Sequence, residues 1–196
     1  MASCATSTRI TGSWKNPKET PKNYKSVLVI ALTGNVVAKS TLENDLADVL
    51  SKNGMMVTKG MEVMPPSFTK DKPNKEAIMS KVKTNGAEGI LTVSIIKEET
   101  ESRYVPGTYG YEPFPRYSYY GDFWGYYDYW YPYSYTPGYY TEDKIYYLET
   151  NFYDASTEAL LWSAQSETYN AESLANVSRE FAELIETKLK QDKILL

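Results

Sequence analysis

The chain of 196 residues contains no histidine, which removes the most frequent general base and the commonest metal ligand of proteins. It has one cysteine, Cys4, so neither a disulfide within the chain nor a cysteine-rich zinc site can form. No stretch approaches the roughly 18 apolar residues that a membrane-spanning helix needs. The net charge of −4 gives no overall positive field to attract nucleic acid. We therefore expect no cofactor, no metal and no nucleic-acid partner.

Two patterns are similar to catalytic or nucleotide-binding motifs, and each lacks a required part. The segment 34–41, GNVVAKST, lies between a predicted strand and a predicted helix, as a phosphate-binding loop does. It has no glycine directly before Lys39 and is one residue short, so a turn capped by Thr33 or Asn35 is the simpler interpretation. Glycosidases use paired carboxylates across a cleft, but the sequence does not place its own pairs in that way; these pairs are Glu98 with Glu99, Glu142 with Asp143, and Asp122 with Asp128. We expect that the protein is not an enzyme.

The first 24 residues are polar and rich in Ser, Thr, Lys and Pro, which is typical of a tether. Within them, Ala2-Ser3-Cys4 matches the end of a bacterial lipoprotein signal peptide, where small residues precede a cysteine that becomes lipidated. Several acyl chains (palmitate among them) on one cysteine give stable anchoring, whereas one chain binds only marginally. The sequence thus predicts a lipid anchor at Cys4, with the membrane as a partner.

After the tether, apolar patterns predict alternating strands and helices. The run 25–32 is nearly all apolar, as in a strand buried on both faces. Leu42, Leu46, Val49 and Leu50 then lie on one face of a predicted helix, while Glu43, Asp45 and Asp48 lie off it and are expected to be solvated. The remaining expected elements are strands at 55–63 and 87–96, a helix at 74–83, a hairpin of strands at 144–153 and 159–168, and a C-terminal helix over about 174–188.

This order is β-α-β-α-β, an insertion, then β-β-α. Alternation of strands and helices favours parallel pairing, and the late hairpin adds antiparallel strands. We expect an α/β (α+β) domain over residues 25–196, with a single mixed sheet of about five strands and about three helices.

The insertion, residues 104–140, is the most unusual part of the chain. Fourteen of the nineteen tyrosines and two of the four tryptophans lie in this Tyr-rich segment, with almost no aliphatic residue. Loops beyond roughly 15 residues are usually functional or disordered. The candidate binding residues are Tyr117, Tyr119, Tyr120, Trp124, Tyr126, Tyr127, Tyr129, Trp130, Tyr131 and Tyr133.

Four interpretations of the Tyr-rich segment follow from its composition. Its carboxylates outnumber Arg103 and Arg116, so it would repel the phosphates of a nucleic acid. Tyrosine faces can stack on sugar rings, and a mixture of Tyr, Trp, Ser and Gly is typical of protein-binding paratopes. The fourth interpretation is a loop that packs on its own domain or stays mobile. We favour a protein partner, with a glycan such as peptidoglycan as the alternative.

Several parts of the sequence together resemble a family of bacterial envelope lipoproteins known mainly as a domain of unknown function. They are Cys4, Ser13-Trp14-Lys15, the strand SVLVIAL, the helix bearing Glu43, GAEGILTVSI, and the hairpin YLETNFYDASTEALLWSAQSET with Thr150, Tyr153, Asp154, Leu161 and Trp162. The similarity covers most of residues 13–190. It implies a topology like that of periplasmic lipoprotein domains in curli secretion and in penicillin-binding-protein activation, and hence an accessory or assembly role.

The resemblance also implies a location. Residues 5–9, directly after Cys4, lack the acidic cluster that marks surface-exported lipoproteins of the Bacteroidetes. We therefore expect a lipid-anchored protein on the periplasmic face of the outer membrane. In the hairpin we expect Tyr153 and Trp162 to be packing residues, and Asp154 to be a turn residue that accepts hydrogen bonds from its own backbone.

Overall fold

The chain forms one mixed sheet with helices, in a computed structural model that describes residues 7–18, 22–64, 75–105, 139–169 and 174–195. Its contacts divide it into two compact units, Met1–Glu99 with Lys144–Leu196, and Thr100–Asp143. The described strands are β1 (Ser7–Lys15), β2 (Ser26–Leu32), β3 (Met56–Lys59), β4 (Gly89–Val105), β5 (Tyr139–Asp154) and β6 (Leu160–Tyr169). The described helices are α1 (Val36–Lys52), α2 (Gly60–Val63), α3 (Lys75–Thr84) and α5 (Leu174–Gln191).

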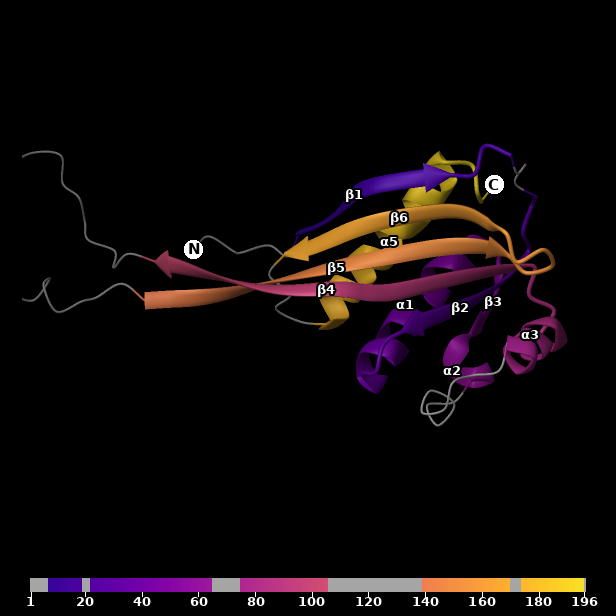
Figure 1. The fold of residues 1–196 in the computed structure, drawn as a ribbon, viewed down its shortest axis with the longest axis horizontal. Coiled ribbons are helices and arrows are strands. Elements are labelled where there is room, and N and C mark those ends of the chain that lie inside the picture. Colours follow the sequence, from indigo (N-terminus) through magenta and orange to yellow (C-terminus); the bar gives the residue numbers. More distant parts are fainter. Residues whose placement is uncertain (1–6, 19–21, 65–74, 106–138, 170–173, 196) are drawn as a thin grey trace, which may run out of the picture. The chain divides into compact units, whose positions relative to one another are not determined.

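The strands lie in the order β1-β6-β5-β4-β2-β3 (Figure 1). Strand β2 pairs in parallel with β3 and with β4, whereas β6 pairs antiparallel with β5 and with β1. The arrows of the neighbouring strands β4 and β5 point in opposite directions (Figure 1). The predicted α/β (α+β) class and the predicted mixture of parallel and antiparallel pairing are confirmed.

The described residues form one strand and one helix more than the sequence predicts, β1 and α2. Each has a physical reason. Residues 7–15, predicted as part of the tether, form the edge strand β1, because their backbone pairs with β6 and Ile10 packs against the core. Residues 55–63, predicted as one strand, divide into β3 and the short helix α2. Gly60 begins this helix where space is scarce, since a Cβ atom there would lie 2.8 Å from Oε1 of Glu43.

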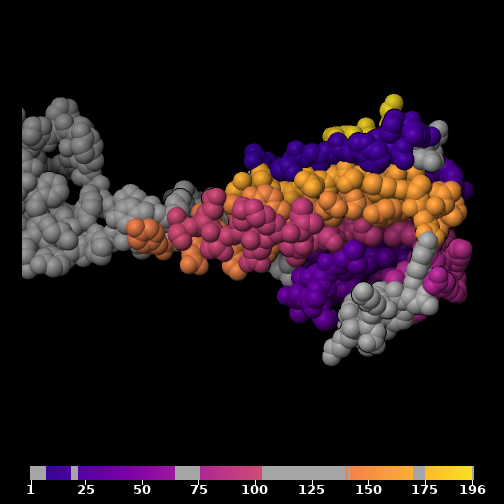
Figure 2. All heavy atoms as spheres, viewed as in Figure 1, coloured from indigo at the N-terminus to yellow at the C-terminus, as the bar shows by residue number. Residues whose placement is uncertain are grey.

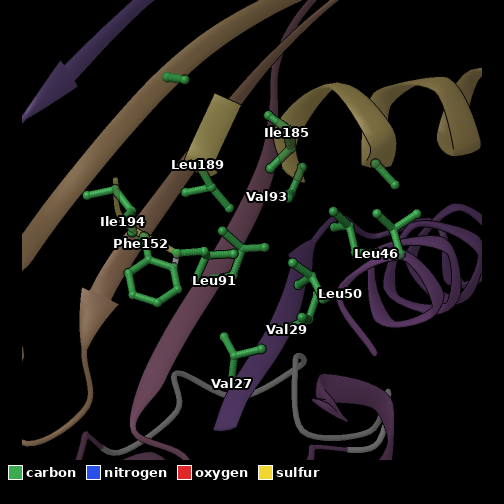
Figure 3. Packing of buried hydrophobic residues seen from close by; sticks show 14 of the residues in the cluster. Val27, Val29, Leu46, Leu50, Leu91, Val93, Phe152, Ile185, Leu189 and Ile194 are labelled. Atoms are coloured by element: carbon green, nitrogen blue, oxygen red, sulfur yellow. The ribbon is translucent and has the colours of Figure 1, made fainter. Parts of the chain in front are cut away.

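The main core lies between one face of the sheet and the helices α1 and α5 (Figure 3). Leu46 and Leu50 of α1 belong to the stripe that the sequence predicts, and both are buried. Trp162 is fully buried as predicted, and its indole Nε1 donates a hydrogen bond of 2.8 Å to Oδ2 of Asp192 beyond the end of α5. The labelled core side chains are Val27, Val29, Leu46, Leu50, Leu91, Val93, Phe152, Ile185, Leu189 and Ile194.

On the opposite face of the sheet, the described residues form a smaller core. Leu28 and Ile30 of β2 form a second buried cluster with Val82 of α3 and with α2. Toward the other edge, β1 and β6 lie at the surface on the face seen in Figure 2, and α5 is visible only at the rim. Tyr153, on this side of the hairpin, is half-buried as a packing residue should be. Among the described residues, helices therefore pack on both faces of the sheet at β2, whereas at the β1 edge a helix, α5, packs on one face.

A buried carboxylate lies where the parallel pairing of β2 with β3 ends. Pairing of β2 with β3 stops at Val29, and the N–H of Ala31 instead donates to Oε1 of Glu43 at 3.0 Å. The other oxygen, Oε2, accepts from the N–H of Met61 at 2.7 Å. Burial raises the pKa of Glu43, while these two donors and the ammonium groups of nearby lysines oppose the rise. The prediction that Glu43 is solvated is wrong. Its buried carboxylate accepts the backbone hydrogen bonds that a neighbouring strand would otherwise accept beyond the end of β3.

Replacing Glu43 by alanine therefore tests its structural role. We expect Glu43→Ala to lower the free energy of unfolding by about 1–3 kcal/mol, because the buried N–H of Ala31 and the partly buried N–H of Met61 lose their acceptor. Urea denaturation of the full chain measures this. Asp48→Ala, at an exposed position of the same helix, serves as the control and should change stability by less than about 0.5 kcal/mol. Equal effects of the two substitutions would contradict the role assigned to Glu43.

Candidate functional site

All site residues predicted from the sequence lie outside the described residues. They are the lipidation residue Cys4 and the aromatic residues Tyr117, Tyr119, Tyr120, Trp124, Tyr126, Tyr127, Tyr129, Trp130, Tyr131 and Tyr133. Strand β4 ends at Val105 and β5 begins at Tyr139, so the described strands reach the borders of the Tyr-rich segment from both sides. Lipidation of Cys4 and binding by these aromatic residues therefore remain predictions.

Strands β4 and β5 both continue past the strands on their outer sides. Pairing of β2 with β4 ends at Ser94, and pairing of β6 with β5 begins at Ile145. Just past these points, Lys144 Nζ lies 2.9 Å from Oε1 of Glu98. The chain therefore leaves the six-stranded part of the sheet and returns to it through two neighbouring strands.

The adjacent carboxylates Glu98 and Glu99 have different partners. While Glu98 pairs with Lys144, Glu99 forms an ion pair with Lys97 and accepts a 2.8 Å hydrogen bond from the hydroxyl of Tyr147. Hydrogen bonds from Lys97 and Tyr147 lower the pKa of Glu99. The same hydrogen bond to Glu99 raises the pKa of Tyr147 to about 12. The two carboxylates are thus held apart in separate ion pairs, which is not the facing arrangement that glycoside hydrolysis uses.

The segment 34–41 is a strand-to-helix turn, as the simpler interpretation predicts. Asn35 caps α1, and its Oδ1 accepts from the N–H groups of Val37 and Ala38 at 3.0 and 3.1 Å. These N–H groups would have to bind the ligand in a phosphate loop. Because the Asn35 side chain already satisfies them, this helix start favours capping over phosphate binding.

A mostly apolar cleft of about 480 Å³ lies between the start of α1 and the strands β4 and β5. The start of α5 completes it with Val177 and the buried residue Ser178, whose hydroxyl has no hydrogen-bond partner among the described residues. The other principal lining residues are Thr33, Asn35, Leu42, Ile95, Tyr146 and Leu148.

One of the residues that line this cleft, Ile95, is apolar and exposed. Together with the exposed apolar residues at the end of β2, at the start of α1 and next along β4, it belongs to a set that we call the apolar end patch: Leu32, Val36, Val37, Ile95 and Ile96. Val37 is 67% exposed and Leu32 is 57% exposed, which is high for such large apolar side chains. Sequence patterns do not predict this patch, since an apolar run such as 25–32 predicts a strand that is buried along its whole length. A usable signal was the pair Val36-Val37 directly after the capping residue Asn35, where the first helical turn projects from the core.

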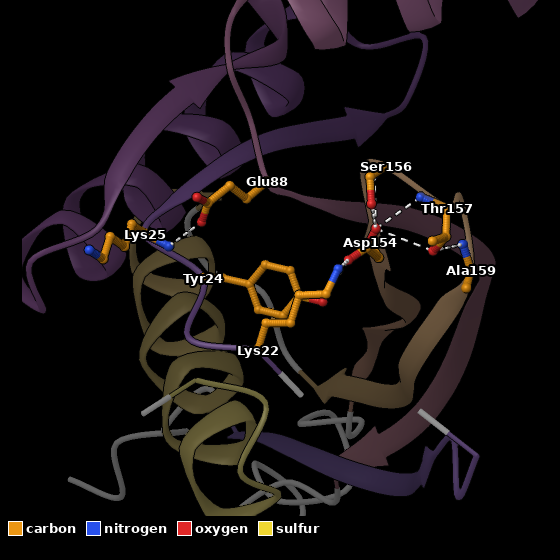
Figure 4. A network of polar contacts seen from close by, with 8 residues as sticks. All are labelled: Lys22, Tyr24, Lys25, Glu88, Asp154, Ser156, Thr157 and Ala159. Atoms are coloured by element: carbon orange, nitrogen blue, oxygen red, sulfur yellow. Dashed lines mark hydrogen bonds and ion pairs between the residues drawn. The ribbon is translucent and has the colours of Figure 1, made fainter. Parts of the chain in front are cut away.

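At the end of the sheet opposite to the apolar end patch, Asp154 forms hydrogen bonds to several residues (Figure 4). As predicted, its carboxylate accepts hydrogen bonds from the backbone of its own turn, namely from the N–H groups of Ser156 and Thr157, both at 2.9 Å. It also binds Lys22 Nζ at 2.8 Å and the Tyr24 hydroxyl at 3.1 Å, which the sequence does not predict. It therefore fastens residues 22–24 to the turn between β5 and β6.

The pKa of Asp154 follows from these contacts. Burial alone would raise it, but the hydrogen bonds from Lys22, Ser156 and Thr157 outweigh burial and hold the pKa well below its usual range. The carboxylate is therefore ionised and accepts several hydrogen bonds. This arrangement suits a residue that stabilises the fold better than one that donates a proton.

Two further findings concern the described ranges alone. No three His, Cys, Asp or Glu side chains in them come close enough together to hold a metal ion. None of the helices there has the length and the apolar character needed to cross a membrane.

We expect Asp154→Asn to destabilise the protein, and the loss to depend on pH. Since the folded pKa lies below the unfolded value near 3.9, Asp154 stabilises the fold above that value and loses its effect as the pH falls through the folded pKa. The stability difference between wild type and variant should be largest above about pH 5 and narrow below about pH 4. Denaturant unfolding at several pH values measures it, with Glu180→Gln as the exposed control. A difference that does not vary with pH would show that the ionised form of Asp154 has no special role.

Comparison with known protein families finds no matching family model, and no curated protein sequence matches the chain. Among solved structures, the chain is similar to a PelC variant dodecamer from Paraburkholderia phytofirmans, with 16% identity, coverage of 92% of this chain and 96% of that chain, and a TM-score of 0.46. It is similar to lipoprotein GNA1162 from Neisseria meningitidis, with 12% identity, coverage of 85% and 98%, and a TM-score of 0.44. A minor lipoprotein from Acinetobacter baumannii follows, with 10% identity, coverage of 88% and 97%, and a TM-score of 0.33. Bacterial lipoproteins are thus among the similar structures, at similarities too low to support an argument about function.

Proposed function

We propose that this protein is a lipid-anchored accessory protein of the bacterial cell envelope. In this proposal Cys4 carries the lipid and holds the protein at the outer membrane, on the periplasmic side. The α/β unit then acts as a scaffold that presents the Tyr-rich segment to an outer-membrane protein.

The observation that carries the proposal is the pairing of the two strands that border the Tyr-rich segment. Strands β4 and β5 are neighbours in the sheet, so the chain leaves the α/β unit toward the segment and returns from it through adjacent strands. Leu91 and Val93 of β4 and Leu148 of β5 are buried in the main core, which fixes those strands. Binding residues are often found on loops that a rigid scaffold positions. A scaffold that holds both ends of a loop reduces the entropy lost when the loop binds.

The composition of the segment supports a protein partner. Tyrosine and tryptophan supply large contact areas at a low cost in side-chain entropy, and both are enriched in protein interfaces. The excess of carboxylates over arginines in the segment opposes a nucleic-acid partner. A glycan of the envelope is the alternative ligand, because aromatic faces also stack on sugars.

Photo-cross-linking in living cells tests the proposed function. A photoreactive amino acid replaces Tyr120, Tyr127 or Tyr133 in the lipidated full chain, and mass spectrometry identifies the cross-linked proteins. We expect all three positions to capture the same envelope protein, because they lie in one presented segment.

Probes at Gln165 and Glu183, exposed positions of the α/β unit, serve as matched controls and should not capture that protein. Cross-links from the three tyrosine positions to this protein's own strands and helices alone would contradict the proposal, since the segment would then be a packed cover.

Sedimentation with insoluble peptidoglycan separates the two ligand classes. The favoured protein partner predicts little retention by peptidoglycan and no change when Tyr127 and Trp130 are replaced by alanine. Strong retention that these two substitutions abolish would replace the protein partner by a glycan.

A further inference from the structure

The apolar end patch gathers at one end of the α/β unit because of the strand directions. Leu32 is the last residue of β2 and pairs with Ser94 of β4, which Ile95 and Ile96 follow directly. Val36 and Val37 begin α1, which starts a few residues after the end of β2. The patch contains five of the eight large hydrophobic side chains that are exposed in the described part of the chain. Such concentration at one end is typical of an interaction surface.

The beginning of strand β1 lies at this same end. Ser7 pairs with Tyr169 at the end of β6, and Tyr169 also pairs with Ile145 of β5, next to Lys144, which contacts Glu98. Only residues 5 and 6 separate Ser7 from Cys4. Three residue steps span at most about 11 Å. A lipid on Cys4 must therefore enter the membrane close to the end of the unit that carries the apolar end patch.

Anchor and patch lie at opposite sides of that end. Four strand spacings separate β1 from β2 in the order of the sheet, which corresponds to about 19 Å. A bilayer that reaches both the lipid near β1 and the patch beside β2 also meets β4 and β5 between them, where Glu98 is paired with Lys144 and Glu99 with Lys97. Two contacts at this separation would restrict the tilt of the unit on the bilayer, which one flexible anchor cannot do.

The chemistry of the patch suits a bilayer surface. No charged residue occurs from Ser26 to Ala38, so the end of β2, the turn and the first residues of α1 bring no charge to be desolvated. The first turn of α1 contains no acidic residue that would repel phosphate headgroups. The two carboxylates that follow Ile96 most closely in the sequence form ion pairs, Glu98 with Lys144 and Glu99 with Lys97.

We propose that the apolar end patch is a membrane-docking surface, and that its occupant is the interfacial region of the bilayer that holds the lipid of Cys4. This inference rests on the proposed lipid anchoring of the protein. Contact of a second apolar site strengthens membrane attachment, because an anchor and a surface patch act on the same bilayer. The α/β unit then stands with the ends of β2 and β6 toward the lipid and the turn of Asp154 away from it.

Site-specific fluorescence on anchored protein tests the orientation. The full chain, expressed behind a lipoprotein signal and purified from membranes, is reconstituted into vesicles of phosphatidylethanolamine and phosphatidylglycerol. A polarity-sensitive fluorophore is attached through Val37→Cys or Met56→Cys, since the lipidated Cys4 has no free thiol. These positions are matched controls: Val37 is 67% and Met56 is 68% exposed, and Met56 pairs with Ser26 at the opposite end of β2.

We expect iodide in the aqueous phase to quench the probe at Val37 several-fold less when the protein is on vesicles than when it is in detergent-free solution after removal of the lipid. Spin-labelled headgroups should quench the Val37 probe and leave the Met56 probe unchanged. A Val37→Glu substitution, with the probe moved to Val36→Cys, should abolish this protection. The new carboxylate is compatible with folding because acidic residues stabilise the start of a helix. Met56→Glu should have no effect.

Equal iodide quenching at both positions of the anchored protein would overturn the docking surface. Protection of Val37 without vesicles would also overturn it, because a second copy or another part of the chain would then cover the patch. Flotation of the unlabelled protein with vesicles separates the two proposals. If it floats and Val37 stays open to iodide, the docking surface alone fails. If it does not float because Cys4 carries no lipid, the proposed anchoring fails first.

Discussion

The main-chain hydrogen bonds of strand β4 decide which parts of this protein lie together. On one side β4 pairs in parallel with β2, and on the other side it neighbours β5, which runs in the opposite direction. The parallel pairing brings the end of β2 and the start of α1 to the point where β4 continues toward the Tyr-rich segment. Through β5 and β6, the antiparallel pairings bring the first residue of β1 to this same end. Reversal of β1 would move Ser7 away from the apolar end patch, and reversal of β2 would separate Leu32 from Ile95 and Ile96 of β4.

Two buried carboxylates complete the sheet at its opposite ends by acting as acceptors for backbone N–H groups. Glu43 binds the N–H groups of Ala31 and Met61 where β3 stops, and Asp154 binds those of Ser156 and Thr157 where the hairpin turns. Their surroundings differ, and so do their pKa values. Burial dominates at Glu43 and raises its pKa, whereas Lys22 and the turn donors dominate at Asp154 and lower it. Both cases follow from the cost of leaving a buried N–H group without an acceptor.

Sequence patterns predicted the elements whose stability comes from burying a regular apolar face. Strand β2, helix α1 with Leu46 and Leu50, the hairpin with Trp162, and helix α5 all belong to this class. Strand β1 was missed because it is polar, and its stability comes from pairing with β6 and from one apolar residue, Ile10. The division between β3 and α2 depends on a contact between Gly60 and Glu43, which are distant in sequence and which no periodicity reveals.

The residues of the candidate site also divide into those that local sequence predicts and those that only the three-dimensional structure reveals. Composition and local motifs are enough to predict Cys4 and the aromatic residues of the Tyr-rich segment as site residues, and these remain predictions because they lie outside the described residues. Of the apolar end patch, only Val36 and Val37 have a local signal, because they follow the capping residue Asn35. Leu32 and Ile96 continue apolar strands, and only the three-dimensional end of the sheet leaves them exposed. The network of Asp154 is intermediate, since its own turn is local in sequence while Lys22 and Tyr24 reach it from more than a hundred residues away.

The most direct test of the account is the mass of the N-terminal peptide of the protein purified from bacterial membranes. The account predicts a peptide that begins at Cys4 and carries a diacylglyceryl group on its sulfur and an acyl chain on its amino group. A peptide that retains Ala2 and Ser3 with an unmodified Cys4 thiol would contradict it. The envelope anchor, and with it the membrane-facing orientation of the α/β unit, would then have to be abandoned.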